Sequence, residues 1–357
     1  MGKDLKGREI GEGVYQLPSK RYCARVSGFG KRISKTFDNL QEARLWIAKK
    51  QIRENPSDFS QDMTLNEWYE YWIVEIKSPS VKISTLAGYK DIYEKHIKQQ
   101  LGYMRLKEIK LIDCQALINN ELKKNKWGTV KHTLVCLNQM FNSAVDFELI
   151  DRSPSEKVKH TTDIIEERRV MTVEEQKLFV NYIKNNSYKY RDESLFILET
   201  GLRIGELLGL KWSDIQDKKI TVSRSMFWDR HEKKYYETTP KTQAGKRIIP
   251  LTNTAYSILK NRKLTRMDYI FLDPDHNTKG SMCSSMKYVC QKIGIEKISP
   301  HGLRHTFATR CIEAGMQPKT LQKILGHAKI TMTMDLYVHV TDDTLIQEIK
   351  KLESLAW

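Results

Sequence analysis

Apolar residues recur at helical spacing between residues 64 and 152 of this chain. The first stripe has spacings of 3, 1, 3, 1 and 3 and consists of Leu65, Trp68, Tyr69, Trp72, Ile73 and Ile76. Thr64 and Glu67 form the pattern of a capping box directly before this stripe, so we expect a helix to begin there. Similar patterns predict three more helices, at residues 84–102, 111–122 and 130–147. This region therefore predicts an all-α bundle with the aromatic stripe in its core.

The first sixty residues have the shorter periodicity of β-strands. Turn signals at residues 18–19 and 28–30 separate three segments, which predict strands at 13–17, 21–27 and 32–37. Asp38 is positioned as the N-cap of a following helix. Residues 1–57 therefore predict a small β-rich N-terminal domain, a three-stranded sheet plus a helix. Its core is so small that we expect neighbours or a ligand to stabilise it.

The periodic pattern is lost between residues 153 and 170, where proline and charged residues predict an inter-domain linker. Thr172 and Glu175 form a second capping box and open the last domain, residues 171–357. Within that domain we expect a strand at 219–224 and a hairpin whose strands, 235–239 and 247–251, flank a polar turn. The chain is therefore expected to be multidomain: a small β-rich domain, an all-α bundle and a mainly α, mixed α+β domain.

Charge narrows the range of partners. The chain has 357 residues, with 60 Lys and Arg against 44 Asp and Glu, which gives a formal net charge of +16. This excess favours a polyanionic partner, with nucleic acid ahead of a membrane because no basic amphipathic helix stands out. The sequence lacks an apolar run of the roughly 18 residues that a membrane span needs, and lacks a signal peptide, so we expect a cytoplasmic protein. Six cysteines without a C-x-x-C pair argue against zinc-ribbon and redox-motif proteins.

The candidate chemistry lies in four segments of the last domain: T-G-L-R-I-G-E-L-L-G-L-K-W with Arg203 and Glu206, T-P-K-T-Q-A-G-K-R with Lys241, S-P-H-G-L-R-H-T with His301 and Arg304, and L-G-H-A with His327, followed by Tyr337. Glu206 stands three positions after Arg203 on an expected helix, where it either orients the guanidinium for binding or forms an ordinary ion pair. Lys241 lies on the exposed turn of the expected hairpin. His301 and His305 are four positions apart, but a third metal ligand is not evident, so we expect no metal site.

Two arginines, a lysine, two histidines and a tyrosine, without a carboxylate cluster, fit metal-free phosphoryl transfer. Two guanidinium groups bind non-bridging phosphate oxygens bidentately and stay charged. A tyrosine hydroxyl can form a covalent phosphoester, and because its ordinary pKa is about 10 it needs nearby cations or a base, for which His301 is a candidate. A lysine on a turn can protonate the departing 5′ hydroxyl, and His327 can donate a hydrogen bond to a phosphate oxygen. This chemistry needs no cofactor.

The order of these residues resembles the catalytic set of the tyrosine recombinase, or phage integrase, family. The motifs T-G-L-R-I-G-E-L-L-G-L-K-W, H-G-L-R-H-T-F-A-T and L-G-H-x-x-x-x-x-T-x-x-x-Y are similar to the boxes of that family, with no departure at the six positions or at the supporting Glu206. The resemblance is strongest over residues 170–345. Residues 64–150 resemble the family's helical core-binding domain. The first sixty resemble, by layout, the arm-type DNA-binding domain of integrases from temperate phages and conjugative transposons.

This resemblance implies a site-specific recombinase, related in chemistry to type IB topoisomerases, that integrates and excises a prophage or mobile element without metal or ATP. Tyr337 would attack the scissile phosphate and form a 3′-phosphotyrosyl link. Arg203 and Arg304 would clamp that phosphate. Lys241 would be the general acid, and His301 the acid/base partner. The implied assembly is a homotetramer on double-stranded DNA in the nucleoid, acting at core and arm attachment sites through a Holliday junction, with an excisionase and a host DNA-bending protein as candidate partners.

Other functions and roles stay open from the sequence. A chromosome-dimer resolvase of the same family would use the same chemistry, but the basic, β-rich first sixty residues favour an integrase. A catalytically idle DNA-binding regulator would be expected to have lost Tyr337 or an arginine, and the chain retains them. A metal-dependent nuclease or transposase would need convergent carboxylates. The resemblance implies that a C-terminal helix, expected at 344–352, docks onto a neighbouring subunit, although its apolar spacing also fits a helix that closes its own core.

Overall fold

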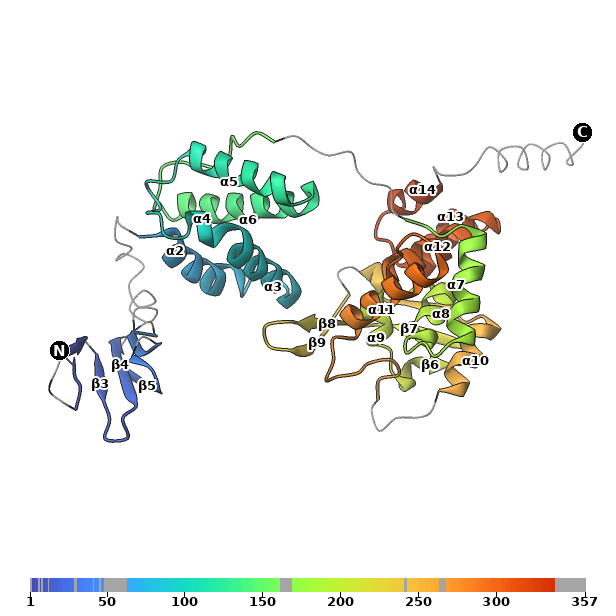
Figure 1. Ribbon diagram of the computed structural model, residues 1–357, viewed down its shortest axis with the longest axis horizontal. Coiled ribbons are helices and arrows are strands. Elements are labelled where there is room, and N and C mark those ends of the chain that lie inside the picture. The colour runs from blue at the N-terminus through green and yellow to red at the C-terminus, as the bar shows by residue number, and fades with distance from the viewer. Residues whose placement is uncertain are drawn as a thin grey trace, which may run out of the picture. The chain divides into compact units, whose positions relative to one another are not determined.

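The chain divides into two compact units, Met1–Ile165 and Glu166–Trp357 (Figure 1). The computed structural model describes residues 2–47 with short gaps, 63–160, 169–240, 243–262 and 268–337. None of the helices in these ranges is both long and apolar enough to cross a membrane.

A small antiparallel sheet forms the N-terminal part of the first unit. Its strands, in the order β3-β4-β5, are Val14–Gln16, Tyr22–Gly28 and Lys31–Phe37. A separate two-stranded sheet pairs β1 (Gly2–Lys3) with β2 (Glu9–Gly11). The shared core consists of Ile10, Val14, Ala24, Ala43 and Ile47. The three predicted strands are confirmed. The β1–β2 pair escapes prediction because strands of two and three residues are too short to show alternation.

Helices make up the rest of the first unit. They are α2 (Leu65–Tyr71), the π-helical η2 (Trp72–Lys77), α3 (Ile83–Ile92), the π-helical η3 (Tyr93–Ile97), α4 (Lys98–Leu101), α5 (Leu111–Lys124) and α6 (Trp127–Asp146). The predicted capping box is confirmed, since the Glu67 backbone N–H donates to Thr64 Oγ1 at 3.3 Å and the Thr64 N–H donates to the Glu67 carboxylate at 2.8 Å. The four predicted helices are all present, with π-helical turns inside two of them.

The aromatic stripe lies in the core of this bundle, as predicted. Trp68 and Trp72 are fully buried, and the Trp68 indole N–H donates to the carbonyl of Met140 at 2.9 Å. Tyr69 stacks on Tyr93 with 3.5 Å between ring centroids. Because a buried polar group is costly unless it is hydrogen-bonded, the contact to Met140 lets the whole Trp68 side chain leave water.

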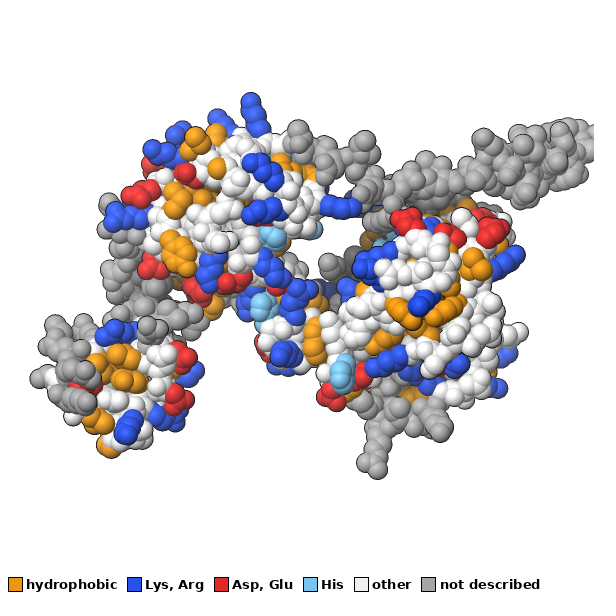
Figure 2. Space-filling model, viewed as in Figure 1, with side chains coloured by type: hydrophobic (Ala, Val, Ile, Leu, Met, Phe, Trp, Pro, Cys, Tyr) orange, Lys and Arg blue, Asp and Glu red, His pale blue; other side chains and the backbone are white. Residues whose placement is uncertain are grey.

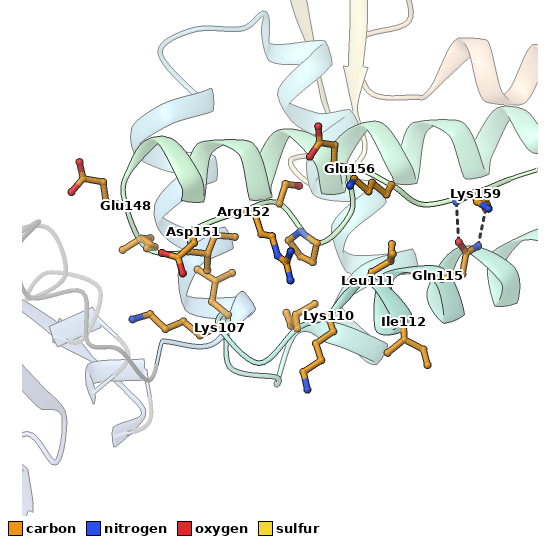
Figure 3. A pocket seen from close by; sticks show the side chains of 17 residues that line it. Lys107, Lys110, Leu111, Ile112, Gln115, Glu148, Asp151, Arg152, Glu156 and Lys159 are labelled. Carbon is orange, nitrogen blue, oxygen red and sulfur yellow. Dashed lines mark hydrogen bonds between the residues drawn. The ribbon is translucent and has the colours of Figure 1, made fainter.

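The start of the segment interpreted as a linker packs against the bundle. The backbone of Lys159 exchanges two hydrogen bonds with the Gln115 side chain of α5, at 2.9 and 2.7 Å, and His160 stacks on Trp127 with 4.2 Å between centroids. With the N-terminal end of α5, this segment lines a pocket of about 990 Å³ whose side chains are partly apolar and partly charged, both basic and acidic (Figure 3). Residues 151–160 thus belong to the helical part of the first unit.

The second unit combines eight described helices with two small sheets. The helices are α7 (Val173–Asn185), α8 (Arg191–Thr200), α9 (Ile204–Leu208), α10 (Asn253–Asn261), α11 (Thr278–Ile293), α12 (Pro300–Glu313), α13 (Pro318–Leu325) and α14 (Thr331–Tyr337), with 3-10 turns η4 (Trp212–Asp214) and η5 (Gln243–Gly245). The strands are β6 (Ile215–Gln216), β7 (Lys219–Val222), β8 (Ser225–Asp229), β9 (Lys234–Thr238) and β10 (Arg247–Pro250). The capping box of Thr172 and Glu175 opens α7 as predicted.

The predicted hairpin of this unit is wrong. β9 pairs with β8, whereas β10 pairs with β7 in a separate sheet ordered β10-β7-β6. Asp229 shapes the β8–β9 turn by accepting a hydrogen bond from the backbone N–H of His231 at 2.8 Å. Strand pairing depends on contacts between segments that are distant in the sequence. Two apolar segments that follow one another along the chain can therefore each pair with a different strand, and their pattern does not show it. Thr238, which ends β9, and Arg247, which begins β10, therefore belong to different sheets and not to one hairpin, and Lys241 lies outside the described residues.

Candidate active site

The predicted Arg203–Glu206 pair lies where α8 ends. Gly201 closes α8 with a left-handed φ of 65°, and a Cβ there would be 2.4 Å from Cδ1 of Phe307 on α12, so only glycine lets the two helices approach. Arg203 is the N-cap of α9, which corrects its predicted place inside a helix. Its backbone N–H and its guanidinium donate to the Glu206 carboxylate at 3.0 and 2.9 Å. This contact fits both interpretations of the pair, an oriented guanidinium and an ordinary ion pair.

The Glu206 carboxylate is shared by three arginines. Arg203 contacts it as described, Arg247 donates to it twice at 2.8 and 3.1 Å, and Nη1 of Arg304 lies 3.8 Å from Oε2. The Glu206 side chain is only 6% exposed. Burial by itself would raise the pKa of this carboxyl, but the three arginines, Arg247 foremost, outweigh burial and lower the pKa to about 2. Glu206 is therefore ionised at neutral pH.

Arg247 is the member of this cluster that the sequence interpretation missed. It begins β10, and its Nε donates to the carbonyl of Ile324 at 2.6 Å while Nη1 also donates to the carbonyl of Gly245 at 3.1 Å. A signal was present: Arg247 stands two positions before the buried Ile249, hence on the same face of the strand. A charge on an inward face needs a partner, and Glu206 is that partner.

Arg304 is held at the centre of the site by backbone carbonyls. Ser299 caps α12 and Pro300 occupies its first turn, both as predicted, which places Arg304 on the second turn. Its guanidinium, 2% exposed, donates to the carbonyls of Gly201 and Leu325, each at 2.7 Å. Burial, and then the neighbouring positive charge of Arg203, lower the pKa of Arg304, yet a guanidinium remains charged at neutral pH.

The end of α13 brings His327 to the same place. Gly326 ends this helix in the left-handed region, with a φ of 66°, as predicted. The Leu325 carbonyl before it also accepts from Nη1 of Arg203 at 3.4 Å, so one carbonyl touches both predicted clamp arginines. His327 is buried, and its Nδ1 lies 2.9 Å from Oγ1 of the fully buried Thr333, which fixes the orientation of the imidazole.

The structure describes the remaining predicted site residues only in part. His301 is exposed on α12, one turn before Arg304, and its ring meets that of His305 edge to face with 4.5 Å between centroids. Tyr337 is the last residue of α14, a helix that packs against α12 and α13. The side chain of Tyr337, the segment with Lys241 and the helix expected at 344–352 lie outside the described parts of the chain.

Comparison with known proteins agrees with this arrangement. The model of the phage integrase family matches residues 169–344, and that of the phage integrase N-terminal SAM-like domain matches residues 64–122. The transposase from transposon Tn916 of Enterococcus faecalis is 30% identical over 98% of this chain and 96% of its own length. A XerC-like tyrosine recombinase of Caldanaerobacter subterraneus is 28% identical over 91% of this chain and 93% of its own length.

Solved structures show the same fold. The Tn1549 transposon integrase in complex with a circular intermediate DNA matches with a TM-score of 0.67 and 27% identity, over 81% of this chain and 99% of the solved chain. A lambda integrase dimer bound to a core site matches with a TM-score of 0.60 and 18% identity, over 92% and 95% of the two chains. Family models, full-length relatives and fold agree: the chain belongs to the phage integrase family and is a tyrosine recombinase of the integrase type.

Proposed function

We propose that this protein integrates and excises a mobile element by cutting and rejoining double-stranded DNA through a covalent 3′-phosphotyrosyl intermediate. The observation that carries the proposal is the convergence of Arg203 and Arg304 on one carboxylate and one carbonyl, next to the turn that holds His327. These residues come from three segments far apart in the sequence, and an assembly of guanidinium and imidazole groups suits the charge that develops on a phosphate in its transition state.

The two arginines would bind the scissile phosphate in different ways. The Arg203 side chain is 37% exposed, so its guanidinium can meet a phosphate oxygen without rearrangement. Arg304 is nearly buried and held by two carbonyls, which fixes the direction of its remaining N–H groups. His327, oriented through Thr333, would donate a hydrogen bond to a non-bridging oxygen. Preorganised donors of this kind act without having to reorient as the reaction proceeds.

Bond making and breaking would involve the residues at the edge of this cluster. The Tyr337 hydroxyl would give its proton to His301 and its oxygen would form a bond to phosphorus, while the bond from phosphorus to the 5′ oxygen breaks and Lys241 gives that oxygen a proton. In the reverse direction, a 5′ hydroxyl from the partner duplex would give its proton to Lys241 and attack the phosphotyrosine, and the Tyr337 oxygen would leave with the proton from His301. The phosphotyrosyl link retains the bond energy, so the exchange would require no ATP, and the two arginines and His327 would stabilise the phosphate charge without a metal ion.

Domain roles follow from the same proposal. Residues 1–57 would bind arm sites, residues 64–152 would bind the core site, and residues 171–357 would carry the chemistry in a homotetramer on DNA. Basic side chains occur on the visible faces of both units (Figure 2). The exposed Lys123 and Lys124 end α5 and the exposed Lys126 follows it, and all three are suited to phosphate contacts. An excisionase and a host DNA-bending protein are the proposed partners on nucleoid DNA.

The XerC-like relative favours a second candidate, a resolvase of chromosome dimers, because it is similar over 91% of the chain. The N-terminal sheet, β3 to β5, weighs towards an integrase with a separate arm-binding domain. An arm-site assay separates the two: an integrase should bind a second class of DNA site, and lose that binding when residues 1–57 are removed, while a resolvase should bind the core site alone.

The experiment for the catalytic proposal is covalent trapping. A candidate attachment-site duplex is nicked so that the short 5′-hydroxyl fragment diffuses away after cleavage, and the adduct is counted on a denaturing gel. Wild-type protein should form the adduct, and Tyr337→Phe should bind the duplex equally well but form none. Tyr288→Phe, an exposed tyrosine of α11, serves as the matched control and should react at the wild-type rate. An adduct with Tyr337→Phe would show that another residue is the nucleophile.

A further inference from the structure

Arg247 connects the parts of the site that come from separate segments. Its side chain is 6% exposed and the guanidinium makes contacts in three directions: two hydrogen bonds to Glu206 in α9, one to the Ile324 carbonyl at the end of α13 and one to the Gly245 carbonyl in η5. It also lies so close to Gly326 that a Cβ there would be 2.9 Å from Nη1. The Arg247 side chain therefore contacts Glu206, which holds Arg203 and Arg304, and the end of α13 directly before His327. It is not one of the predicted catalytic residues.

Charge explains why a third arginine is present. Glu206 carries one negative charge and faces Arg203 and Arg304, so by itself it would cancel half of their positive charge. Arg247 balances that carboxylate and leaves the two clamp arginines with a net charge of +2 towards a phosphate. Removal of Arg247 would lower this to +1 and would leave a buried carboxylate with fewer donors, which is costly in a low-dielectric site.

Arg247 also determines the orientation of the Glu206 carboxylate. The planar guanidinium meets both carboxylate oxygens, at 2.8 and 3.1 Å, so it fixes the plane of the Glu206 carboxylate. That plane determines where Oε1 accepts from Arg203 and where Oε2 faces Arg304. A shift of about 1 Å in a positioning group is enough to reduce a rate about a hundredfold.

We propose that Arg247 is a positioning residue for phosphoryl transfer: it acts through Glu206 to set the spacing and net charge of the Arg203–Arg304 clamp. This inference rests on the proposed function. Because Arg247 is buried and contacts no proposed DNA-binding side chain among its described partners, we expect it to control the rate of cleavage and not the affinity for DNA.

The test compares Arg247→Met and Arg247→Lys in the full chain on the nicked duplex. Arg247→Met should slow adduct formation by about a hundredfold or more, with DNA affinity within about twofold of wild type. Arg247→Lys keeps the positive charge but not the planar guanidinium that bonds both carboxylate oxygens, and should recover part of the rate. Arg262→Met is the matched control, because Arg262 pairs with the buried Glu193 at the opposite end of α8, at 2.9 Å. It should disturb only the Glu193 end of α8 and leave the cleavage rate unchanged.

Two further measurements identify the route of action. In a duplex whose 5′ bridging oxygen is sulfur, the leaving group needs no proton, so a defect at the Lys241 donor would be rescued and a defect of the clamp would not; we expect no rescue. The double variant Glu206→Gln/Arg247→Met should react no more slowly than Glu206→Gln alone, because one acts through the other.

The outcomes of these experiments test the role of Arg247 separately from the proposed function. Full rescue by the sulfur substrate, additive losses in the double variant, or a wild-type rate for Arg247→Met would overturn the role of Arg247. If Arg247→Met does not fold, Arg247→Lys carries the same comparisons. Wild-type protein that forms no adduct would instead contradict the proposed function itself.

Discussion

Two buried carboxylates at opposite ends of α8 have opposite electrostatics. Glu206, beyond the C-terminal end, accepts four hydrogen bonds from two arginines with a third nearby, and its pKa falls to about 2. Glu193, in the first turn, receives one hydrogen bond from Arg262 at 2.9 Å, and its Oε2 is buried without a partner among the described residues. Burial therefore raises the pKa of Glu193, and Arg262 offsets this only in part.

The difference shows that burial alone does not mark a functional carboxylate. Both side chains are about 6% exposed, so the solvent cost of ionisation is similar. What separates them is the number of guanidinium donors and their arrangement on both oxygens. A perturbed acid is often taken as a sign of catalysis. In this protein the proposed site surrounds the carboxyl with the lowered pKa, and in the proposed function that carboxylate holds the cations that would meet a phosphate.

The largest effect should come from the clamp itself. Arg304→Ala removes a guanidinium proposed to bind the scissile phosphate and leaves Glu206 with one neighbour fewer, so adduct formation should fall by about a thousandfold or more, with DNA binding largely kept. Single-turnover trapping on the nicked duplex measures the rate. Arg262→Ala, which disturbs only the Glu193 end of α8, is the control. Cleavage near the wild-type rate in Arg304→Ala would remove this residue from the site and end the contrast between the two carboxylates.

Local signals allowed much of this site to be predicted. The Thr172 capping box, the Ser299–Pro300 helix start and the glycine stop at Gly326 depend only on neighbouring residues, and the structure shows all three. They place Arg304 and the His327 turn correctly, because helix ends are determined by short-range hydrogen bonds.

What escaped prediction depends on contacts between distant segments. The partner of β10 is β7 and not β9, and no spacing along the chain encodes that choice. The role of Arg247 has the same origin: its carboxylate partner lies 41 positions away, and its carbonyl partner Ile324 lies 77 positions away. A sequence pattern could indicate that Arg247 faces inward, but not what it faces.

The next effect should be on the free energy of unfolding, to which the two carboxylates should contribute differently. Glu206 has a lowered pKa in the folded protein, so its ionised form stabilises the fold above the ordinary pKa near 4.5, and this contribution is lost as pH falls towards 2. Glu206→Gln should therefore reduce the free energy of unfolding by roughly 3 kcal/mol at pH 7, and by less below pH 4.5. Urea unfolding from pH 7 to pH 3 measures the difference.

Glu193→Gln is the matched variant for that measurement and should behave in the opposite way. A raised pKa means that the ionised form is disfavoured in the fold, so stability from this group is lost as pH rises through its folded pKa. A neutral amide at neutral pH should leave the free energy of unfolding unchanged or higher, since Arg262 keeps Asp192 as an ion-pair partner at 3.5 Å. Equal losses in both variants would mean that the arginines around Glu206 contribute no special stability.

The smallest effect should come from the contact that orients His327. Thr333→Val preserves the shape of the side chain but removes the hydroxyl 2.9 Å from Nδ1, so the imidazole can rotate and its hydrogen bond to a phosphate oxygen weakens. One such bond, weakened but not removed, corresponds to about a tenfold slower cleavage. Thr133→Val in α6 controls for the cost of a valine at a fully buried threonine. If both variants cleave at the wild-type rate, His327 is oriented without Thr333, and the clamp around Glu206 acts independently of the α13–α14 turn.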